Sequence, residues 1–316
     1  MMPRRTTSLV AALSLLTLGT PLIAGCGAQQ NIVEEVSNNA DLSSEDTFAL
    51  NDEIAELSKL IENKPQDAYA HTKRGYAKRL SGDYQGAIAD YSKAIEINPQ
   101  YAAAYNNRGN AKKELQDTQG AIDDYSKAIQ INPNDALAYY NRGHLKGRDL
   151  GDALGAIDDF NKAIEINSQL ALAFTNRGIA KRTLGDMQGA IDDYSKAIQI
   201  NPNDALAYYN RGNANDELGD YLEAIADYTK AIDINPQDAD AYNNRCYTRN
   251  SLEDHKGAIS DCNKAIVIYP QYADAFVNRG IAKEIIGDLN SACEDWKEAA
   301  SLGDKDAAEW VRDQCQ

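Results

Sequence analysis

The chain has 316 residues, of which 43% are hydrophobic and 25% are charged. Asp and Glu number 48 against 32 Lys and Arg, which gives a formal net charge of −16 at pH 7. This acidic balance argues against nucleic acid and anionic lipid head groups as partners, because both carry charge of the same sign.

Residues 1–26 predict a targeting segment rather than part of the fold. Two early arginines supply a positive start, and the apolar run Leu9 to Leu18 is too short to span a membrane. The stretch Ile23 to Cys26, Ile-Ala-Gly-Cys, resembles the lipobox of bacterial lipoproteins, which implies cleavage before Cys26 and attachment of lipid to it. An ordinary secretory signal cut nearby is the alternative. We therefore expect an exported protein, lipid-anchored to the cell membrane or outer membrane and facing the periplasm or exterior.

Two different segments precede the main part of the chain. Residues 27–46 are rich in Gln, Asn, Ser and Glu, and they have too few large apolar groups to fold, so we expect a flexible tether. Within residues 47–67, Ile54 to Glu62 aligns with Ile88 to Glu96 of the first repeat described below, and a proline follows each at the same distance. We expect a solitary N-terminal capping helix, equivalent to half a repeat.

From residue 68 onward the sequence repeats itself with a period of 34 residues. The stretch Gly120 to Gly143 returns unchanged at Gly189 to Gly212. We number the positions of each repeat as slots 1 to 34, leaving out the one extra residue of the third repeat, near Gly147 to Gly151. Slot 4 is aromatic and slot 8 is Gly in six repeats, while slots 20 and 27 are Ala in all seven. The predicted repeats are 68–101, 102–135, 136–170, 171–204, 205–238, 239–272 and 273–306.

Each repeat predicts two amphipathic helices. Slots 4, 8 and 11 share one face of a first helix, and slots 20, 24 and 27 share one face of a second. Gly-Asp at slots 15 and 16 stops the first helix and caps the second, and Asn-Pro at slots 31 and 32 ends the second. This pattern resembles the tetratricopeptide repeat (TPR) family, whose unit is a helix–turn–helix of this length.

The resemblance implies an all-α superhelical solenoid, in which repeats are stable as a stacked array. The TPR-like part covers Ala68 to Asp306, as seven repeats with the solitary helix before them. After it, residues 307–316 have Ala, Trp310 and Val311 at helical spacing, so we expect a C-terminal capping helix over the open apolar end.

Two patterns predict contacts between the helices of one hairpin. Slot 7 is Arg and slot 23 is Asp in all seven repeats, at nearly the same height in a hairpin turning near slot 16, so we predict Arg–Asp pairs within or between repeats. Cys246 and Cys262 are equidistant from one such turn, and Cys293 and Cys315 from another. In an oxidising compartment these spacings predict disulfides Cys246–Cys262 and Cys293–Cys315. The alternative is four buried thiols.

The first helices of TPR arrays line a concave groove, and here slot 6 of these helices is nearly always Asn. The row resembles the asparagine ladder of the TPR domain of O-GlcNAc transferase, whose amides hold an extended peptide by its backbone. Tyr140 and Tyr209 at slot 5, with Tyr76 and Tyr247 at slot 9, stand around this row. Alternatively, Asn at slot 6 ties neighbouring first helices together. The row consists of Asn107, Asn141, Asn176, Asn210, Asn244 and Asn278.

No catalytic motif is found, and the three His lie in different repeats without a metal-ligand cluster around them, so we expect no enzyme, cofactor or metal. The resemblance implies a non-enzymatic scaffold or adaptor at the bacterial cell envelope, binding an extended segment of a protein partner in its groove. Contact with the membrane is expected only through the lipid anchor. The carboxylate clamp of chaperone-binding TPR domains needs Lys at slots 2 and 5, and slot 2 is never basic here, so a chaperone tail is not expected. The alternative is a structural, self-associating module with no peptide ligand.

Overall fold

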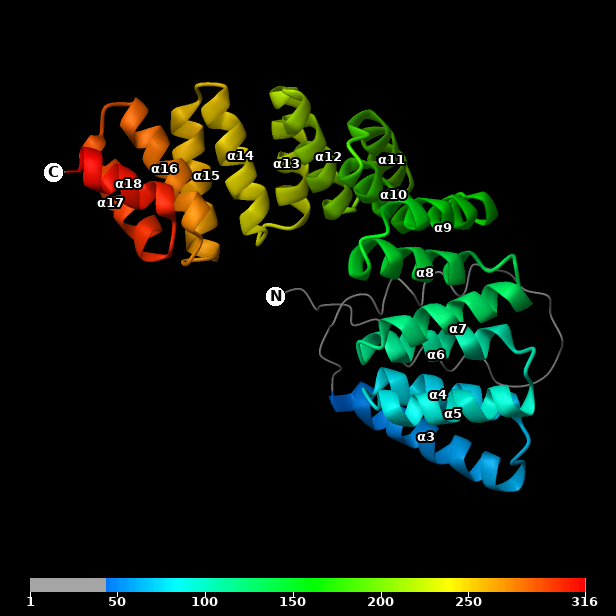
Figure 1. Ribbon diagram of the computed structural model, residues 1–316. Helices are drawn as coiled ribbons and strands as arrows, with labels where there is room; N and C mark the ends of the chain where they lie inside the picture. The colour runs from blue at the N-terminus through cyan, green and yellow to red at the C-terminus, as the bar shows by residue number, and fades with distance from the viewer. Residues whose placement is uncertain (1–43, 316) are drawn as a thin grey trace, which may run out of the picture. The chain divides into compact units, whose positions relative to one another are not determined.

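The computed structural model describes residues 44–315, which form antiparallel helix hairpins and contain no strand (Figure 1). The chain divides into two compact units after Pro133, and each is described by itself. The first unit contains α3 (Ser44–Asn63), α4 (Ala68–Leu80), α5 (Tyr84–Ile97), α6 (Ala102–Glu114) and α7 (Thr118–Ile131). The second unit contains α8 (Ala136–Asp149), α9 (Ala153–Ile166), α10 (Ala171–Thr183), α11 (Met187–Ile200), α12 (Ala205–Leu218), α13 (Tyr221–Ile234), α14 (Ala239–Ser251), α15 (His255–Ile268), α16 (Ala273–Ile285), α17 (Leu289–Ser301) and α18 (Lys305–Gln314).

The helix ends follow the Gly-Asp pattern of the sequence. Gly185 ends the α10 turn at a φ of +84°, a conformation that Gly adopts at little cost. The next residue, Asp186, then accepts a hydrogen bond from the backbone N–H of Gly189 at 3.0 Å and so caps α11. The extra residue of the third repeat lengthens α8, and Gly151 turns the chain back at a φ of +67°.

Close packing of the two helices explains the Gly at slot 8. A Cβ on Gly212 would lie 2.8 Å from the ring of Tyr228, and one on Gly178 would lie 2.6 Å from the ring of Tyr194. Both rings are fully buried, so a larger residue at slot 8 has no space. The same relation joins Gly75 to the Tyr91 ring in the first unit.

Every repeat contains the predicted Arg–Asp ion pair, and in each case it lies within one hairpin. The slot-23 Asp is only 3 to 5% exposed, and its Oδ1 lies 2.5 to 2.7 Å from the slot-7 Arg Nη2. In six repeats a cation at slot 11 lies 2.7 to 2.9 Å from the other carboxylate oxygen. In the remaining repeat Asn215 takes this place and donates to Asp227 at 3.2 Å.

The first repeat shows how such a carboxylate stays ionised although it is buried. Burial raises the pKa of Asp90, but hydrogen bonds from Arg74 and Lys78 outweigh burial, so its pKa lies below the ordinary value. The Asp is therefore charged at neutral pH and holds the two cations of α4 against α5.

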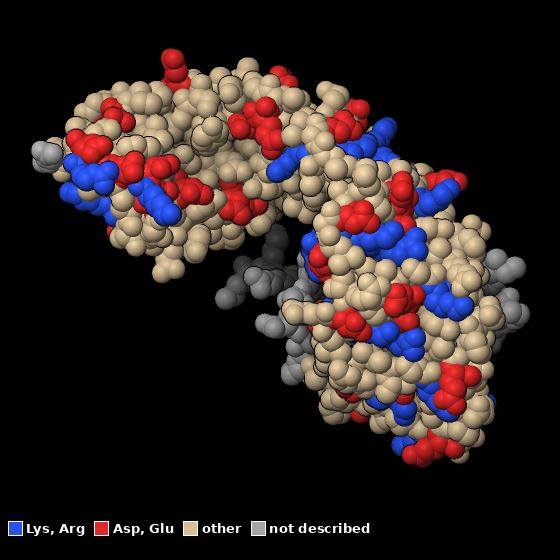
Figure 2. Space-filling view, viewed as in Figure 1, with Lys and Arg blue, Asp and Glu red and all other residues tan. Residues whose placement is uncertain are grey.

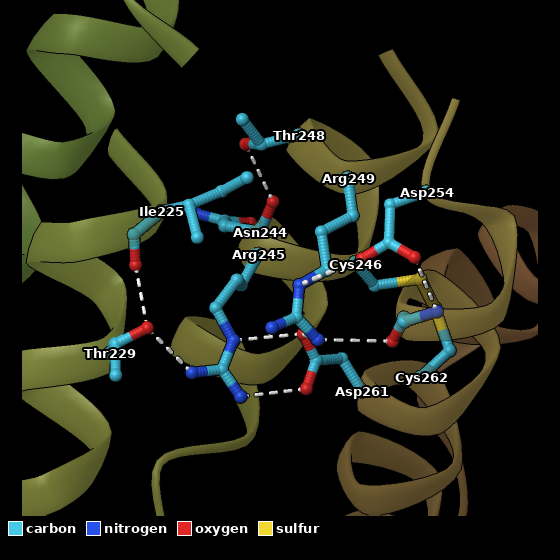
Figure 3. Close-up of polar contacts among 11 residues, drawn as sticks. Ile225, Thr229, Asn244, Arg245, Cys246, Thr248, Arg249, Asp254, Asp261 and Cys262 are labelled. Carbon is cyan, nitrogen blue, oxygen red and sulfur yellow. Dashed lines mark hydrogen bonds and ion pairs between the residues drawn. A yellow bond between two sulfur atoms is a disulfide. The ribbon is translucent and has the colours of Figure 1, made fainter. Parts of the chain in front are cut away.

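The same arginines also connect consecutive repeats, which the sequence pattern did not reveal. Arg245 Nη1 donates to the hydroxyl of Thr229 in the preceding hairpin at 2.8 Å (Figure 3). Arg108 makes the same contact with Ser92 at 3.0 Å in the first unit. One guanidinium thus joins its own hairpin through Asp and the preceding one through slot 25, which fixes the stacking of repeats as well as the hairpin.

The four cysteines lie in the predicted pairs. Cys246 and Cys262 lie at disulfide distance between α14 and α15, with their Cα atoms 5.6 Å apart (Figure 3). Cys293 and Cys315 do the same between α17 and the end of α18, also with a Cα separation of 5.6 Å.

Helices α3 and α18 pack on the first and last hairpins. Helix α3 packs on α4 and buries Leu50, and α18 packs on α17, where the Trp296 and Trp310 rings lie 5.3 Å apart. Both helices start earlier than the predicted segments, since α3 begins at Ser44 and α18 begins at Lys305, directly after its capping residue Asp304.

Candidate functional site

The predicted asparagine row lies on the first helices, and three of its amides contact the preceding repeat. Asn176 Nδ2 donates to the Tyr140 hydroxyl at 3.3 Å, and Asn244 Nδ2 donates to the Tyr209 hydroxyl at 3.1 Å. Asn278 Nδ2 donates to Asn243 Oδ1 at 3.0 Å. In each pair the acceptor occupies slot 5 of the preceding repeat. This geometry supports the alternative in which slot 6 ties neighbouring first helices together.

The other members of the row differ from these three. Asn210 is 7% exposed and donates to the carbonyl of Leu206 in its own helix at 2.9 Å, so it presents little surface. Asn107 and Asn141 are half-buried on α6 and α8. The row is therefore not a uniform ladder of open amides, and a binding role would have to be concentrated at a few positions.

One polar hollow of about 310 Å³ lies among the first helices of the second unit. Three first helices, α10, α12 and α14, contribute to it, and Tyr228 of α13 lies at its floor. The lining residues are Arg182, Tyr209, Asn213, Asp216, Glu217, Tyr228, Asn244 and Tyr247. We call this site the polar hollow. It includes Tyr209 and Asn244 from the sequence prediction and Tyr247 from the surrounding tyrosines.

A hydrogen-bond network holds the floor of the polar hollow in place. The Tyr228 hydroxyl donates to Asn213 Oδ1 at 2.8 Å, and Asn244 Nδ2 donates to the same oxygen at 2.9 Å. Asn244 also donates to the Tyr209 hydroxyl. Because the network includes α12, α13 and α14, it holds the amide of Asn213 in one orientation and positions polar groups before any ligand arrives.

The floor tyrosine is protonated at any physiological pH. Burial raises the pKa of Tyr228 well above its ordinary value of 10.0, and the nearby Asp216 carboxylate and Tyr209 raise it further. Its hydroxyl therefore remains a hydrogen-bond donor to Asn213, and the hollow keeps this donor arrangement unless the repeat unfolds.

Sequence reasoning did not single out Asn213, Asp216, Glu217 or Arg182. A signal was available, because slots 9, 12 and 13 follow slot 5 by about one and two helical turns and so share its face. What the sequence could not show is that these slots from three repeats meet around one hollow.

The lining of the polar hollow contains no set of residues that could hold a metal ion. Among residues 44–315, no group of three or more His, Cys, Asp or Glu side chains could hold a metal ion. In the same range no helix has the length and apolar character needed to cross a bilayer. Cys26 and the predicted lipoprotein signal lie outside the described residues.

Sequence profiles of known families match the repeats directly. The profile described as TPR repeat matches residues 75–116, 109–149 and 180–219, and two described as tetratricopeptide repeat match 136–170 and 205–238. This chain is a tetratricopeptide repeat protein. As a TPR protein it belongs to a group that generally binds protein or peptide partners. No curated protein matches it.

Solved TPR structures resemble this one in part or most of its length. YrrB, described as a TPR protein with an unusual peptide-binding site, is 27% identical with a TM-score of 0.51, over 58% of this chain and 95% of its own. A TPR protein from Parabacteroides merdae is 22% identical with a TM-score of 0.57, over 78% of this chain and 98% of its own. PilF of Pseudomonas aeruginosa is 18% identical with a TM-score of 0.60, over 67% of this chain and 96% of its own. The last two likenesses show the fold alone.

Proposed function

We propose that this TPR protein is a non-enzymatic scaffold at the bacterial cell envelope that holds an extended segment of a protein partner along its first helices. The polar hollow carries the proposal. It is the place where side chains from three repeats converge with their polar groups already oriented, and small polar sites of this kind give a binding surface its specificity. Half-buried members of the asparagine row, such as Asn141, would add contacts to the backbone of the bound segment.

Three observations support this function. The family generally binds proteins or peptides. YrrB, whose fold this chain shares at 27% identity, is described as having a peptide-binding site. Tyr247 stands at the hollow with 53% of its surface exposed, and a large exposed aromatic group supplies contact area at low cost in conformational entropy.

The proposed location rests on the cysteine pairs and on the N-terminal stretch that ends at Cys26. The cysteine pairs at disulfide distance favour an oxidising compartment outside the cytoplasm. The lipobox-like stretch ending at Cys26 adds a lipid anchor to the proposal, with residues 27–43 as its tether. Metabolic labelling with a fatty-acid probe tests this directly, since the parent should carry the label and Cys26→Ala should not, while an unlabelled parent or equal labelling of both would contradict the anchor.

Site-specific photo-crosslinking in intact cells tests the binding site. Benzoylphenylalanine in place of Tyr247 should crosslink a specific partner, because position 247 faces the polar hollow. The matched control places the same group at Lys230 on α13, whose side chain is 63% exposed and does not line the hollow. Crosslinking of equal yield and identity at both positions would contradict binding in the hollow. Crosslinking of position 247 to a second copy of this chain would favour the self-associating alternative.

A further inference from the structure

The charges around the polar hollow are unevenly compensated. Arg182 is its one cation, and the Arg182 Nε lies 3.3 Å from a Glu217 carboxylate oxygen, so these two residues neutralise each other. Asp216 makes no ion pair among residues 44–315. The hollow therefore has one carboxylate more than its own cation can balance.

Asp216 is held in position rather than free to turn away. The hydroxyl of Thr248, which is fully buried on the next first helix, lies 2.6 Å from Asp216 Oδ1 and 2.9 Å from the carbonyl oxygen of Asn244, so its one proton is shared between these two acceptors (Figure 3). The other carboxylate oxygen accepts no hydrogen bond from the described residues. A carboxylate with one oxygen held and the other open can accept a hydrogen bond from a charged donor. Because the side chain is already held in the free protein, binding costs little further side-chain entropy.

Aromatic groups complete the surroundings. Tyr209 and Tyr247 line the hollow together with Asp216, and Tyr247 is 53% exposed, whereas the Tyr228 ring is buried beneath Tyr209 with its centroid 6.1 Å away. Ring faces attract ammonium and guanidinium groups and also accept the methylene stem of Lys or Arg. Apolar or anionic side chains fit less well, because the first would leave Asp216 without a partner and the second would meet a carboxylate.

We propose that the polar hollow is the pocket for one Lys or Arg side chain of the bound segment, with the cation at Asp216 and the stem against Tyr209 and Tyr247. The inference rests on the proposed peptide-binding function and names the partner chemistry. Figure 2 shows both acidic and basic side chains over α13 to α18, but the chain as a whole has a formal net charge of −16, which favours the approach of a basic segment.

A random twelve-residue peptide library displayed on phage tests the proposal, with the disulfide-containing protein as the immobilised target. Enriched peptides should share Lys or Arg at one position. Replacing that residue by Met in the synthetic peptide should weaken binding about ten-fold, the usual effect of losing a charged hydrogen bond. Binding should also weaken as salt rises from low to physiological concentration.

Variants of the hollow identify the pocket. Asp216→Asn keeps the oxygen that accepts from Thr248 but removes the charge, so it should bind the Lys or Arg peptide about ten-fold more weakly and show a flatter salt dependence. It should bind the Met peptide as the parent does. Glu217→Gln is a second variant at an exposed position, and it should also weaken binding of the Lys or Arg peptide, because it leaves the Arg182 cation without its partner at the hollow. The matched control is Asp233→Asn, a 62% exposed acid on α13 outside the hollow.

Each outcome separates this inference from the function on which it rests. Peptides that reduce the crosslinking at position 247 but contain no required basic residue would overturn the cationic pocket and leave peptide binding standing. Peptides that bind Asp216→Asn as tightly as the parent would do the same. A library that yields no peptide dependent on the hollow would overturn both. Loss of binding in Asp233→Asn as well would show a general charge effect and also overturn the pocket.

Discussion

Two neighbouring hairpins of the second unit solve one packing problem in different ways. In α12 and α13, Gly212 leaves space for the ring of Tyr228. In α14 and α15 the same two slots contain Cys246 and Cys262, both fully buried and at disulfide distance. Both arrangements bring the two helices of the hairpin close together, one by a ring against a bare backbone and the other by a covalent link.

The difference decides what each hairpin presents to the first-helix surface. The Tyr228 ring is long enough for its hydroxyl to reach Asn213 and anchor the polar hollow. Cys262 is short and stays in the core, so it cannot reach the surface as the Tyr228 hydroxyl does. Tyr247, which occupies slot 9 as Asn213 does, is therefore not bonded from slot 24 and is exposed. A core residue with a polar end can therefore organise a binding surface, whereas a disulfide of the same helices only joins them.

The largest expected effect comes from the ion pairs of these hairpins. Asp261→Ala leaves Arg245 and Arg249 without their shared carboxylate, and removing one partner of a buried pair costs about 3–5 kcal/mol. Asp227→Ala should cost less, because it strands Arg211 alone, whose side chain is 23% exposed against 11% for Arg245. Urea unfolding followed by circular dichroism measures both, with Asp233→Ala as control. Equal losses would contradict this ranking.

Removing the cysteine pair is the next largest change. Cys246→Ala with Cys262→Ala opens a loop of 16 residues and should lower the unfolding free energy by about 3 kcal/mol. Cys246→Gly with Cys262→Tyr copies the neighbouring hairpin and should recover part of this loss, because the ring refills the core without the covalent link. Intact mass after thiol alkylation checks the starting state, and four alkylated thiols in the unreduced protein would contradict the pairing.

The Gly–ring contact can be tested from the other hairpin. Gly212→Ala places a methyl group 2.8 Å from the Tyr228 ring and should destabilise the protein by about 1–3 kcal/mol. In a Tyr228→Leu background the same change should cost less, because the shorter side chain leaves space. Thermal unfolding of the four proteins forms a double-mutant cycle, and purely additive losses would show that the ring is not the obstacle.

The smallest effect separates the polar end of the ring from its bulk. Tyr228→Phe keeps the ring but loses the hydrogen bond to Asn213, which should cost about 1 kcal/mol at pH 7. The same variant should weaken peptide binding in the polar hollow, since Asn213 is then held only by Asn244. No change in binding would show that the floor network does not position the site.

The pH dependence of Tyr228→Phe gives a second reading. Burial raises the pKa of Tyr228 in the folded protein above its ordinary value of 10.0, so the phenol is un-ionised in the fold while it ionises in the unfolded chain. Stability from this group is full below pH 10 and is lost as pH rises above it, by about 1.4 kcal/mol per pH unit. Unfolding at pH 9 to 11 should show a shallower decline in Tyr228→Phe than in the parent.

The sequence by itself determined the architecture of the repeats. The 34-residue period indicates which face of each helix is buried and places the Gly and ring slots, the Arg and Asp slots and the paired cysteines at matching heights, although it left open whether the Arg–Asp pairs lie within or between repeats. These contacts join the two helices of one hairpin, where the short turn leaves almost no choice of register. The caps at Asp186 and Asp304 are likewise local, because each involves a backbone N–H three residues away.

Only the tertiary structure decided which groups meet between repeats. The spacing places Asn244 and Asn213 on a helix face, but it does not say that both converge with Tyr228 on one oxygen. It likewise placed Arg245 opposite Asp261 without revealing its contact with Thr229. Contacts between stacked repeats depend on side-chain rotamers and on the stacking itself, which a one-dimensional period does not encode, and the polar hollow is made of such contacts.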